Sequence, residues 1–511
     1  MDTSNERHAG VVPRLALAGL LLATLFVGRT AGARSAVGHE GADRVSAKAA
    51  GLPPTRLADL LREARERNPS IAAADARARA AAAVPARVSA LDEPTLGWEA
   101  WNFPGGVRIG QADNNIFRLS QRLPFPGKRR LAGEMAERDA DVARSDATAA
   151  RLDVELELKT AFVAYWQAHA NAAIHARERE ILERSARTAE QRYATGEVPQ
   201  ADVLRSQLEL GHAISRVRTG DLAIEQARVR INSLLSRDPS TPLGAPEAPG
   251  HPRIGWTAPE LASLAFDLRP ELAGRDAAIG REEAGVALAE KGFWPDFEVS
   301  VSRFVNHDQP DGFGAMASVT LPFVQRGKVE AAVAEGNARI AAARAERRAL
   351  EDRIRRSIED LLLRARTDVL QHDVFLDTHI PQAEQALRVT ESAWASGAVD
   401  LMAYLDTVRA IEQAHLEHVA TQAEFEITWA EIERTVGRDL PRARGEELDA
   451  GAAIEHARVT KLPTEAAPGA RSGRRGRRRV GADSPPVVAP ARDALASATS
   501  AASAVREGSR R

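Results

Sequence analysis

Two histidines come closest to forming a chemical site. His415 and His418 are three positions apart, so they would share one face of a helix, with Glu417 between them. Metalloproteases of the H-E-x-x-H type space their histidines four apart instead. Packed or solvated histidines therefore explain the pair better than a metal site does. We predict no metal ligands and no cofactor.

Other catalytic signatures are absent from the sequence. It contains no G-x-S-x-G elbow, no phosphate-binding P-loop and no dinucleotide fingerprint. The lack of cysteine excludes disulfides, thiolate metal sites and cysteine nucleophiles. Only four methionines are present, which gives little sign of soft copper ligands. We therefore predict that the protein is not an enzyme and has no catalytic residues.

The composition favours helices and argues against nucleic acid as a partner. Of the 511 residues, 44% are hydrophobic but only 5% are aromatic, and alanine, the best helix former, fills much of the apolar share. The formal net charge is -2, whereas proteins that bind nucleic acid are usually basic.

The two ends differ from the rest. Arg7 and Arg14 precede an apolar run at 15–27 and a small-residue cleavage site, so we predict a signal peptide at 1–33, followed by a linker at 34–56. The apolar run is shorter than the ~20 residues that a membrane anchor needs. At the other end, 441–511 contains a basic run but few large apolar residues, and we predict a disordered, solvated tail.

The longest uninterrupted stretch, Glu134 to Thr195, contains no glycine or proline and predicts a helix far longer than the usual 11–12 residues. Charge, as in residues 177–180, covers much of its surface. An apolar residue recurs at every seventh position, which predicts a coiled-coil seam. The seam residues are Met135, Val142, Ala149, Leu156, Val163 and Ala170, widened by Leu152, Trp166 and Ile174. Such a helix needs equally long partners.

The chain is an internal duplication. Gly397 follows Gly196 by 201 residues, and Pro270 follows Pro69 at the same offset. The predicted repeats cover 57–238 and 258–440, joined by a Pro-rich linker at 239–257.

Each repeat reads as two helices, two strands, a long helix, a glycine turn and a returning helix. The first two helices are predicted at 57–67 and 70–91, then at 258–266 and 271–291. A second long helix is predicted at 328–393, and Pro85 and Pro381 should each kink the helix that contains them.

Four short segments alternate apolar and polar residues and predict strands at about 94–101, 115–123, 295–303 and 313–322. Their length suits tilted membrane strands, although a small soluble sheet fits as well. The smallest membrane barrels have about eight strands, so four strands in a membrane must share a barrel with other chains. Two chains would supply eight strands and three would supply twelve.

Two motifs at these positions carry a family resemblance. The run from Leu123 to Arg129 reads Leu-Pro-Phe-Pro-Gly-Lys-Arg, and Arg192 to Val198 forms the first glycine turn. With the duplication, they make the region from about Leu57 to Leu440 resemble the TolC-like outer membrane efflux proteins.

The resemblance implies a mostly α fold with a small membrane β part. In a homotrimer, four strands per chain would contribute to a shared twelve-stranded β-barrel in outer membrane lipid, and the long helices would form an α-barrel in the periplasm. The chain would be a passive duct for an inner-membrane pump, joined by a periplasmic adaptor protein. The first motif is most similar to the heavy-metal branch, which implies a pump of the resistance-nodulation-division (RND) class, with heavy-metal cations or drugs as cargo.

The resemblance also implies sites at the periplasmic tip. The turns at 194–199 and 395–400 would contact the adaptor through Gly196, Val198, Gly397 and Val399. Glycines that merely cap helices are the simpler interpretation. Asp202 and Asp406 would line a constriction that favours cations, unless they are ordinary surface aspartates.

Two other functions remain open. A protein-exporting type I secretion duct would look nearly the same, because the pump selects the cargo. A periplasmic coiled-coil scaffold would keep the helices but would not need the membrane.

Overall fold

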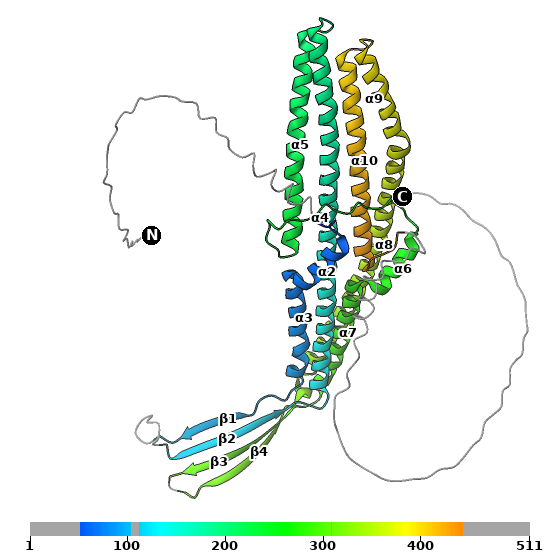
Figure 1. The fold of residues 1–511 in the computed structure, drawn as a ribbon. Helices are drawn as coiled ribbons and strands as arrows, with labels where there is room; N and C mark the ends of the chain where they lie inside the picture. The colour runs from blue at the N-terminus through cyan, green and yellow to red at the C-terminus, as the bar shows by residue number, and fades with distance from the viewer. Residues whose placement is uncertain (1–51, 104–111, 308, 443–511) are drawn as a thin grey trace, which may run out of the picture. The chain divides into compact units, whose positions relative to one another are not determined.

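The computed structural model describes residues 52–103, 112–307 and 309–442. The predicted signal peptide, nearly all of the linker at 34–56 and the tail from 443 onward lie outside these residues. The described part is mostly helical with one small antiparallel sheet, which confirms the predicted fold class (Figure 1).

The two halves of the described chain have the same order of elements, as expected for a duplication (Figure 1). The first half contains α2 (Leu57–Arg67), α3 (Pro69–Val88), β1 (Thr95–Trp101), β2 (Asn114–Leu123), α4 (Lys128–Ala194) and α5 (Gln200–Leu234). The second contains α6 (Ala258–Leu268), α7 (Pro270–Glu290), η1 (Lys291–Phe293), β3 (Phe297–Asn306), β4 (Gly312–Val319), η2 (Pro322–Gln325), α8 (Arg326–Val374), η3 (Phe375–His379), α9 (Ile380–Ala395) and α10 (Leu401–Val436).

Local sequence sets several of these boundaries. The Asn68 side chain caps α3 by accepting a hydrogen bond from the Ser70 amide at 2.8 Å, and Pro69 occupies the first turn, where its missing N–H costs nothing. Thr257 and Glu260 form a capping box at the start of α6. Gly437, with φ of +98°, ends α10.

The longest helix, α4, begins earlier than predicted. It starts at Lys128 and runs through Gly133, which the sequence had suggested as its boundary. Gly133 is buried, and a Cβ atom there would lie 3.2 Å from Cβ of Ser89. The missing side chain lets the segment after α3 approach α4 closely.

The predicted seam of α4 is confirmed in part: Leu152, Val163 and Trp166 are buried, and Ala170 and Ile174 pack on the cluster that Val163 and Trp166 form with α10. Of its six heptad residues only Val163 is fully buried, and the other five are half-buried. The fully buried heptad positions are the small residues Gly133, Ala140, Ala147, Val154 and Ala161. Helices α3, α5, α7 and α10 all contact α4, so several faces are partly covered and small side chains mark the closest approaches.

Helix α8 does not run unbroken to 393. A π-helical turn, η3, separates α8 from α9, whose second residue is Pro381. Proline has no N–H to continue the hydrogen-bond ladder, and a widened turn is one way to absorb that loss.

The sheet has the order β1-β2-β3-β4, and every neighbouring pair is antiparallel. Strands β2 and β3 join the halves, with Leu119 opposite Val301. Observed strand ends differ from the predicted ones by up to three residues, most at the loop end of β3 and at the end of β4, where Pro322 opens η2.

The Leu-Pro-Phe-Pro-Gly-Lys-Arg motif ties the two halves together beside this sheet. The Phe125 ring stacks on Trp294 with centroids 4.9 Å apart. One carboxylate oxygen of Asp296 accepts hydrogen bonds from the Phe125 amide and the Lys128 ammonium, both at 2.8 Å. The motif therefore fixes the start of α4 against the start of β3.

Within residues 52–103, 112–307 and 309–442, no helix combines the length and apolar character needed to cross a bilayer.

Candidate functional site

The two glycine turns have the same backbone geometry. Gly196 follows α4 and Gly397 follows α9, and both have φ of +78°, a conformation that favours glycine. In each, the glycine N–H donates to a carbonyl three residues back at 3.0 Å, from Tyr193 and Trp394 respectively. Both turns lie at the end of the helices remote from the sheet (Figure 1).

The two turns differ in how open they are. A side chain at Gly196 would meet no atom within 4 Å, whereas one at Gly397 would come within 3.0 Å of the Arg192 guanidinium. Arg192 also donates to the Trp394 carbonyl at 2.5 Å, so it links the first turn to the second. Val198 is half-buried, and Val399 packs against the core below the turns.

That core holds the two hairpins together inside one chain. The rings of Trp394 and Tyr404 stack with centroids 4.9 Å apart and planes 8° apart. Leu182 of α4 and Val203 of α5 pack in the same cluster as Leu401 of α10.

The aspartates predicted to line a constriction lie on different helices. Asp202 is half-buried in the first turn of α5. Asp406 is exposed on α10, with its carboxylate 2.9 Å from Arg409, which also contacts Glu209 at 2.5 Å. Because Arg409 offsets the charge of Asp406 within the chain, any attraction of cations there would be weakened. The constriction remains a prediction.

A buried ionic network, missed by the sequence reasoning, crosses from the first repeat to the second. Arg216 of α5 donates to both carboxylate oxygens of Glu178 on α4 and lies 3.4 Å from Glu412 of α10. His175 lies 2.9 Å from Glu412. Glu178 is only 4% exposed, although it sits in the charged run 177–180 that we expected to be solvated.

Protonation of this network should make stability depend on pH. Burial, with a hydrogen bond to Glu412, raises the pKa of Glu178 to about 7, well above the ordinary glutamate value of 4.5. The folded state therefore holds a proton, between pH 4.5 and 7, that the unfolded state has lost. Stability should fall as the pH rises through that range, by about 1–3 kcal/mol.

We expect Glu178→Gln to remove most of that slope, because the amide cannot ionise. Denaturation followed by helical circular dichroism at pH 5 and pH 8 measures it. Glu180→Gln, an exposed position on the same helix, is the control and should keep the slope. An unchanged slope in Glu178→Gln would assign the pH dependence to other groups.

A second buried charge cluster lies where the halves meet. Lys159 of α4 contacts Glu433 of α10 at 2.7 Å and Asp439 at 2.5 Å. Burial alone would lower the pKa of Lys159, but the two carboxylates raise it above its usual value, so the ammonium stays charged. The cluster borders a cavity of about 380 Å³ that Trp166 and Trp429 also line.

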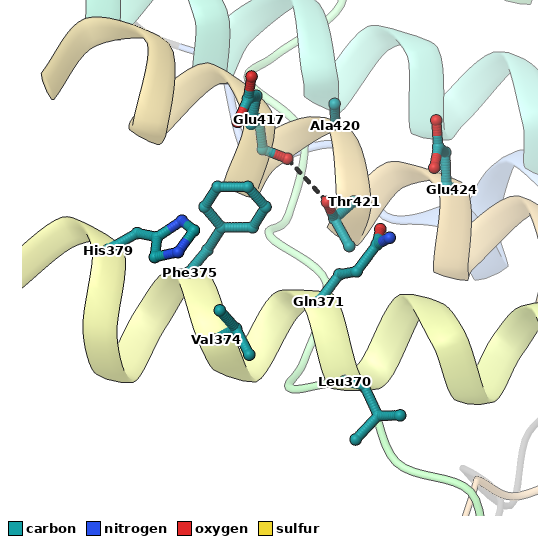
Figure 2. A pocket seen from close by; sticks show the side chains of 9 residues that line it. All are labelled: Leu370, Gln371, Val374, Phe375, His379, Glu417, Ala420, Thr421 and Glu424. Carbon is teal, nitrogen blue, oxygen red and sulfur yellow. Dashed lines mark hydrogen bonds between the residues drawn. The ribbon is translucent and has the colours of Figure 1, made fainter. Parts of the chain in front are cut away.

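The π-helical turn opens a groove of about 560 Å³ between α8 and α10 (Figure 2). Phe375 and His379 pack edge to face on one side, and the Thr421 hydroxyl donates to the Glu417 carbonyl on the other. Glu424 and the exposed side chain of Leu370 also line this groove. Its mixed lining offers no nucleophile–base pair, and the groove marks where α8 departs from regular helix.

Comparisons with known proteins find a matching family, similar chains and similar folds. Residues 261–438 match the family described as outer membrane efflux protein. The cobalt-zinc-cadmium resistance protein CzcC of Cupriavidus metallidurans is 22% identical over 325 residues, which is 62% of this chain and 75% of CzcC. The fusaric acid resistance protein FusA of Burkholderia cepacia is 26% identical over 263 residues, and that match spans about half of each chain.

Solved structures share the fold. The chain superposes on CusC with a TM-score of 0.65 at 13% identity, covering 75% of this chain and 92% of CusC. It superposes on the outer membrane protein VceC of Vibrio cholerae with a TM-score of 0.62 at 17% identity, covering 75% of this chain and 97% of VceC.

Proposed function

We propose that this chain is the outer membrane channel of a tripartite efflux system. Its resemblance to the outer membrane efflux proteins is confirmed by the comparisons. The channel would conduct substrate passively from an inner-membrane pump and a periplasmic adaptor to the outside. The observation that carries the proposal is the sheet, which exposes one largely apolar face.

That face is built in rows across the four strands. Leu96, Leu119, Val301 and Ala315 pair side by side along one row. The next row toward the β1–β2 loop contains Trp98, Phe117, Arg303 and Phe313. Most of the large apolar side chains in these rows are exposed, and an exposed apolar face of this kind suits lipid better than water.

Polar residues interrupt the face only toward its ends. Arg303 lies between two phenylalanines near the loop end, where it stacks on Phe313 and contacts Asp311 at 2.8 Å. Gln121 lies toward the opposite end, where its amide donates to the Asp92 carbonyl at 2.8 Å. Aromatic and polar side chains that flank an aliphatic band are typical of membrane strands at the two interfaces.

The other face is mostly polar, with Ile116 and Phe304 as apolar exceptions toward the loop end. Glu99 contacts Arg118 at 2.9 Å, and Arg118 reaches the Ser302 hydroxyl at 3.4 Å. Such a face suits a water-filled lumen.

Four strands leave β1 and β4 with one neighbour each in the described sheet, so the edges need partners before the sheet can sit in lipid. Three chains would close a twelve-stranded barrel, and two would close one of eight. We favour the homotrimer because the family resemblance implies it. The long helices of three chains would then surround one tunnel.

The partners follow from the same proposal. The turns at Gly196 and Gly397 would dock a periplasmic adaptor, and the pump would be of the RND class. Heavy-metal cations or drugs are the favoured cargo, because CzcC is named for cobalt, zinc and cadmium resistance and FusA for fusaric acid resistance. A protein-secretion duct remains the alternative, while the exposed apolar sheet disfavours a soluble periplasmic scaffold.

A charge on the apolar face should block assembly. Val301 is exposed in the middle of that face, opposite Leu119 and Ala315, and Val301→Arg is expected to cost about 2–4 kcal/mol near the bilayer midplane. We expect little trimer in the detergent extract of outer membranes, measured by mass. The matched control is Ser318→Arg, at an exposed position on the polar face opposite Glu298.

Wild type and Ser318→Arg should both yield a detergent-dependent trimer. A wild-type protein that is released without detergent, or that is a monodisperse monomer, would contradict the proposed function. Equal trimer yields from both arginine variants would contradict the assignment of the lipid face. Ser300 would be a poor polar-face control because its side chain is only 3% exposed.

A further inference from the structure

Three histidines and an aspartate from three separate segments meet near the π-helical turn. His251 belongs to the segment that connects the two halves, His372 and Asp373 lie at the end of α8, and His418 lies on α10. In sequence they are far apart, and only the fold brings them together.

Three of the four residues have donor atoms close enough to share one ion, and the ring of the fourth, His418, lies next to them. One ligand atom each from His251, His372 and Asp373 lies within 4.8 Å of the others. The Asp373 carboxylate is 3.4 Å from Nδ1 of His372 and 3.7 Å from Nε2 of His251. The His418 ring lies beside His372, with centroids 4.6 Å apart.

Three further observations point to a ligand rather than to simple packing. Nε2 of His418 is buried and has no hydrogen-bond partner, which is uncommon for a buried polar atom. His372 is only 3% exposed, so its imidazole is enclosed next to the His418 ring. The π-helical turn begins two residues after Asp373, and such turns are frequent at functional sites.

The second group of potential metal ligands in the described residues is less suited to binding a cation. His175, Glu178 and Glu412 also lie close together, but the Arg216 guanidinium contacts both carboxylates. A fixed positive charge inside that cluster already serves as the counter-ion and would repel a metal cation. No Lys or Arg is among the partners that the structure gives to the Asp373 carboxylate, which are His251 and His372.

We propose that His251, His372, Asp373 and His418 form a binding site for one divalent transition-metal cation of the Zn²⁺ class. Imidazole nitrogens with a carboxylate oxygen are a ligand set that Zn²⁺ and Co²⁺ accept, whereas Ca²⁺ and Mg²⁺ prefer oxygen alone. With metal–ligand bonds of about 2.0–2.1 Å, a tetrahedral site places its ligand atoms about 3.3 Å apart. The cluster must therefore contract, and His251 can supply that movement because its side chain is half-exposed on a connecting segment.

A bound ion would join the connecting segment to α8 and α10 beside the break in the long helix. The consequence is mechanical: the ion would stabilise the folded arrangement of these three segments by mass action. This site lies in the helical wall and belongs to the protein itself, so the proposal does not depend on which cargo the channel carries.

The test uses the full mature chain in detergent, purified without a histidine tag and freed of metal with a chelator. Titration with Co²⁺ should give the visible absorption of a tetrahedral cobalt centre and saturate at one ion per chain, and Zn²⁺ should displace it. His251→Ala should weaken binding at least tenfold, by analogy with the 10–100-fold losses that follow removal of even a supporting group. His212→Ala, which removes an exposed histidine of α5, is the control and should bind like wild type.

A second readout separates binding from misfolding. Zn²⁺ should raise the thermal midpoint of wild type and of His212→Ala, and this gain should be absent in His251→Ala, whose midpoint without metal should be unchanged. Absence of a saturable cobalt spectrum in wild type would overturn the proposal. Equal affinity in His251→Ala and wild type would overturn it as well, as would equal losses in both alanine variants.

Discussion

Lys159→Met is expected to lower the free energy of unfolding by about 3–5 kcal/mol, because it leaves the largely buried Glu433 carboxylate without the ammonium that it contacts at 2.7 Å. The Lys159 ammonium lies between Glu433 and Asp439, and the Glu433 carboxylate also accepts a hydrogen bond from the Leu440 amide at 2.9 Å. The cluster joins the middle of α4 to the end of α10. Loss of the cation should therefore loosen the contact between the two halves.

The effect should depend on pH in a definite direction. Burial already raises the pKa of Glu433, and Lys159 opposes that rise. Without the lysine the folded variant gains stability by keeping Glu433 protonated, and that contribution fades as the pH rises above the ordinary glutamate range. The loss relative to wild type should therefore be smaller at pH 5 than at pH 8.

Denaturant titrations followed by helical circular dichroism measure both quantities. The matched control is Arg230→Met, which breaks an exposed ion pair with Glu157 between α5 and α4, and it should change stability by less than about 1 kcal/mol. A loss in Lys159→Met no greater than that of the control would show that the cluster is well hydrated. Lys159→Met combined with Glu433→Gln should recover part of the loss, because a neutral amide costs less to bury than an unpaired carboxylate.

The repeated architecture could be predicted because it is determined by sequence patterns among neighbouring residues. Proline and glycine residues recur at a nearly constant offset, and residue alternation marks the strands, so Val299 is exposed on the apolar face and Ser300 lies on the other. These signals depend only on neighbours in sequence. The same reasoning found both glycine turns, whose φ of +78° explains why glycine stands there.

The buried charges could not be found in this way. Glu178 lies in a run of alternating charges that reads as solvated surface, yet its carboxylate is paired with Arg216 and lies at the contact with α10. Lys159 and Glu433 are 274 positions apart in the sequence. The local sequence pattern does not distinguish a solvated charged residue from one whose ion-pair partner is distant in sequence and close only in the folded structure.

The histidines also show that contacts between residues distant in sequence could not be predicted from local patterns. The sequence suggested His415 and His418 as a pair because they share a helical face. In the structure the ring beside His418 belongs to His372, and His251 approaches from the connecting segment. The seam of α4 was only partly right for a related reason, since the burial of Met135 or Ala149 depends on which neighbouring helices cover α4 and not on heptad spacing alone.

Bulky side chains at the tip turns should abolish export while leaving the channel assembled. The positions to change are Glu197 and Ala398, each directly after a turn glycine and each exposed. Replacing Gly196 or Gly397 themselves would confound the test, because their φ of +78° strains any other residue. Neither neighbour has a positive φ, so the double variant Glu197→Trp, Ala398→Trp adds bulk without that strain.

If the turns dock the adaptor, two indole rings at the contact should prevent close approach of the helical hairpins. Under the proposed heavy-metal cargo, cells that lack their own channel and carry this variant should be as sensitive to Co²⁺, Zn²⁺ and Cd²⁺ as cells with no channel at all. Crosslinking of the variant to the adaptor should also be lost. Trimer yield should stay normal, because the sheet lies at the opposite end of α4, about 100 Å away at 1.5 Å per residue.

The matched control keeps the same positions and removes the bulk. Glu197→Gln with Ala398→Ser should restore wild-type resistance and crosslinking. Full resistance in the tryptophan variant, at normal trimer levels, would show that the turns are not the adaptor contact. Loss of the trimer itself would favour the simpler interpretation, in which the turns only connect antiparallel helices and any bulk there disturbs the packing of Trp394 on Tyr404.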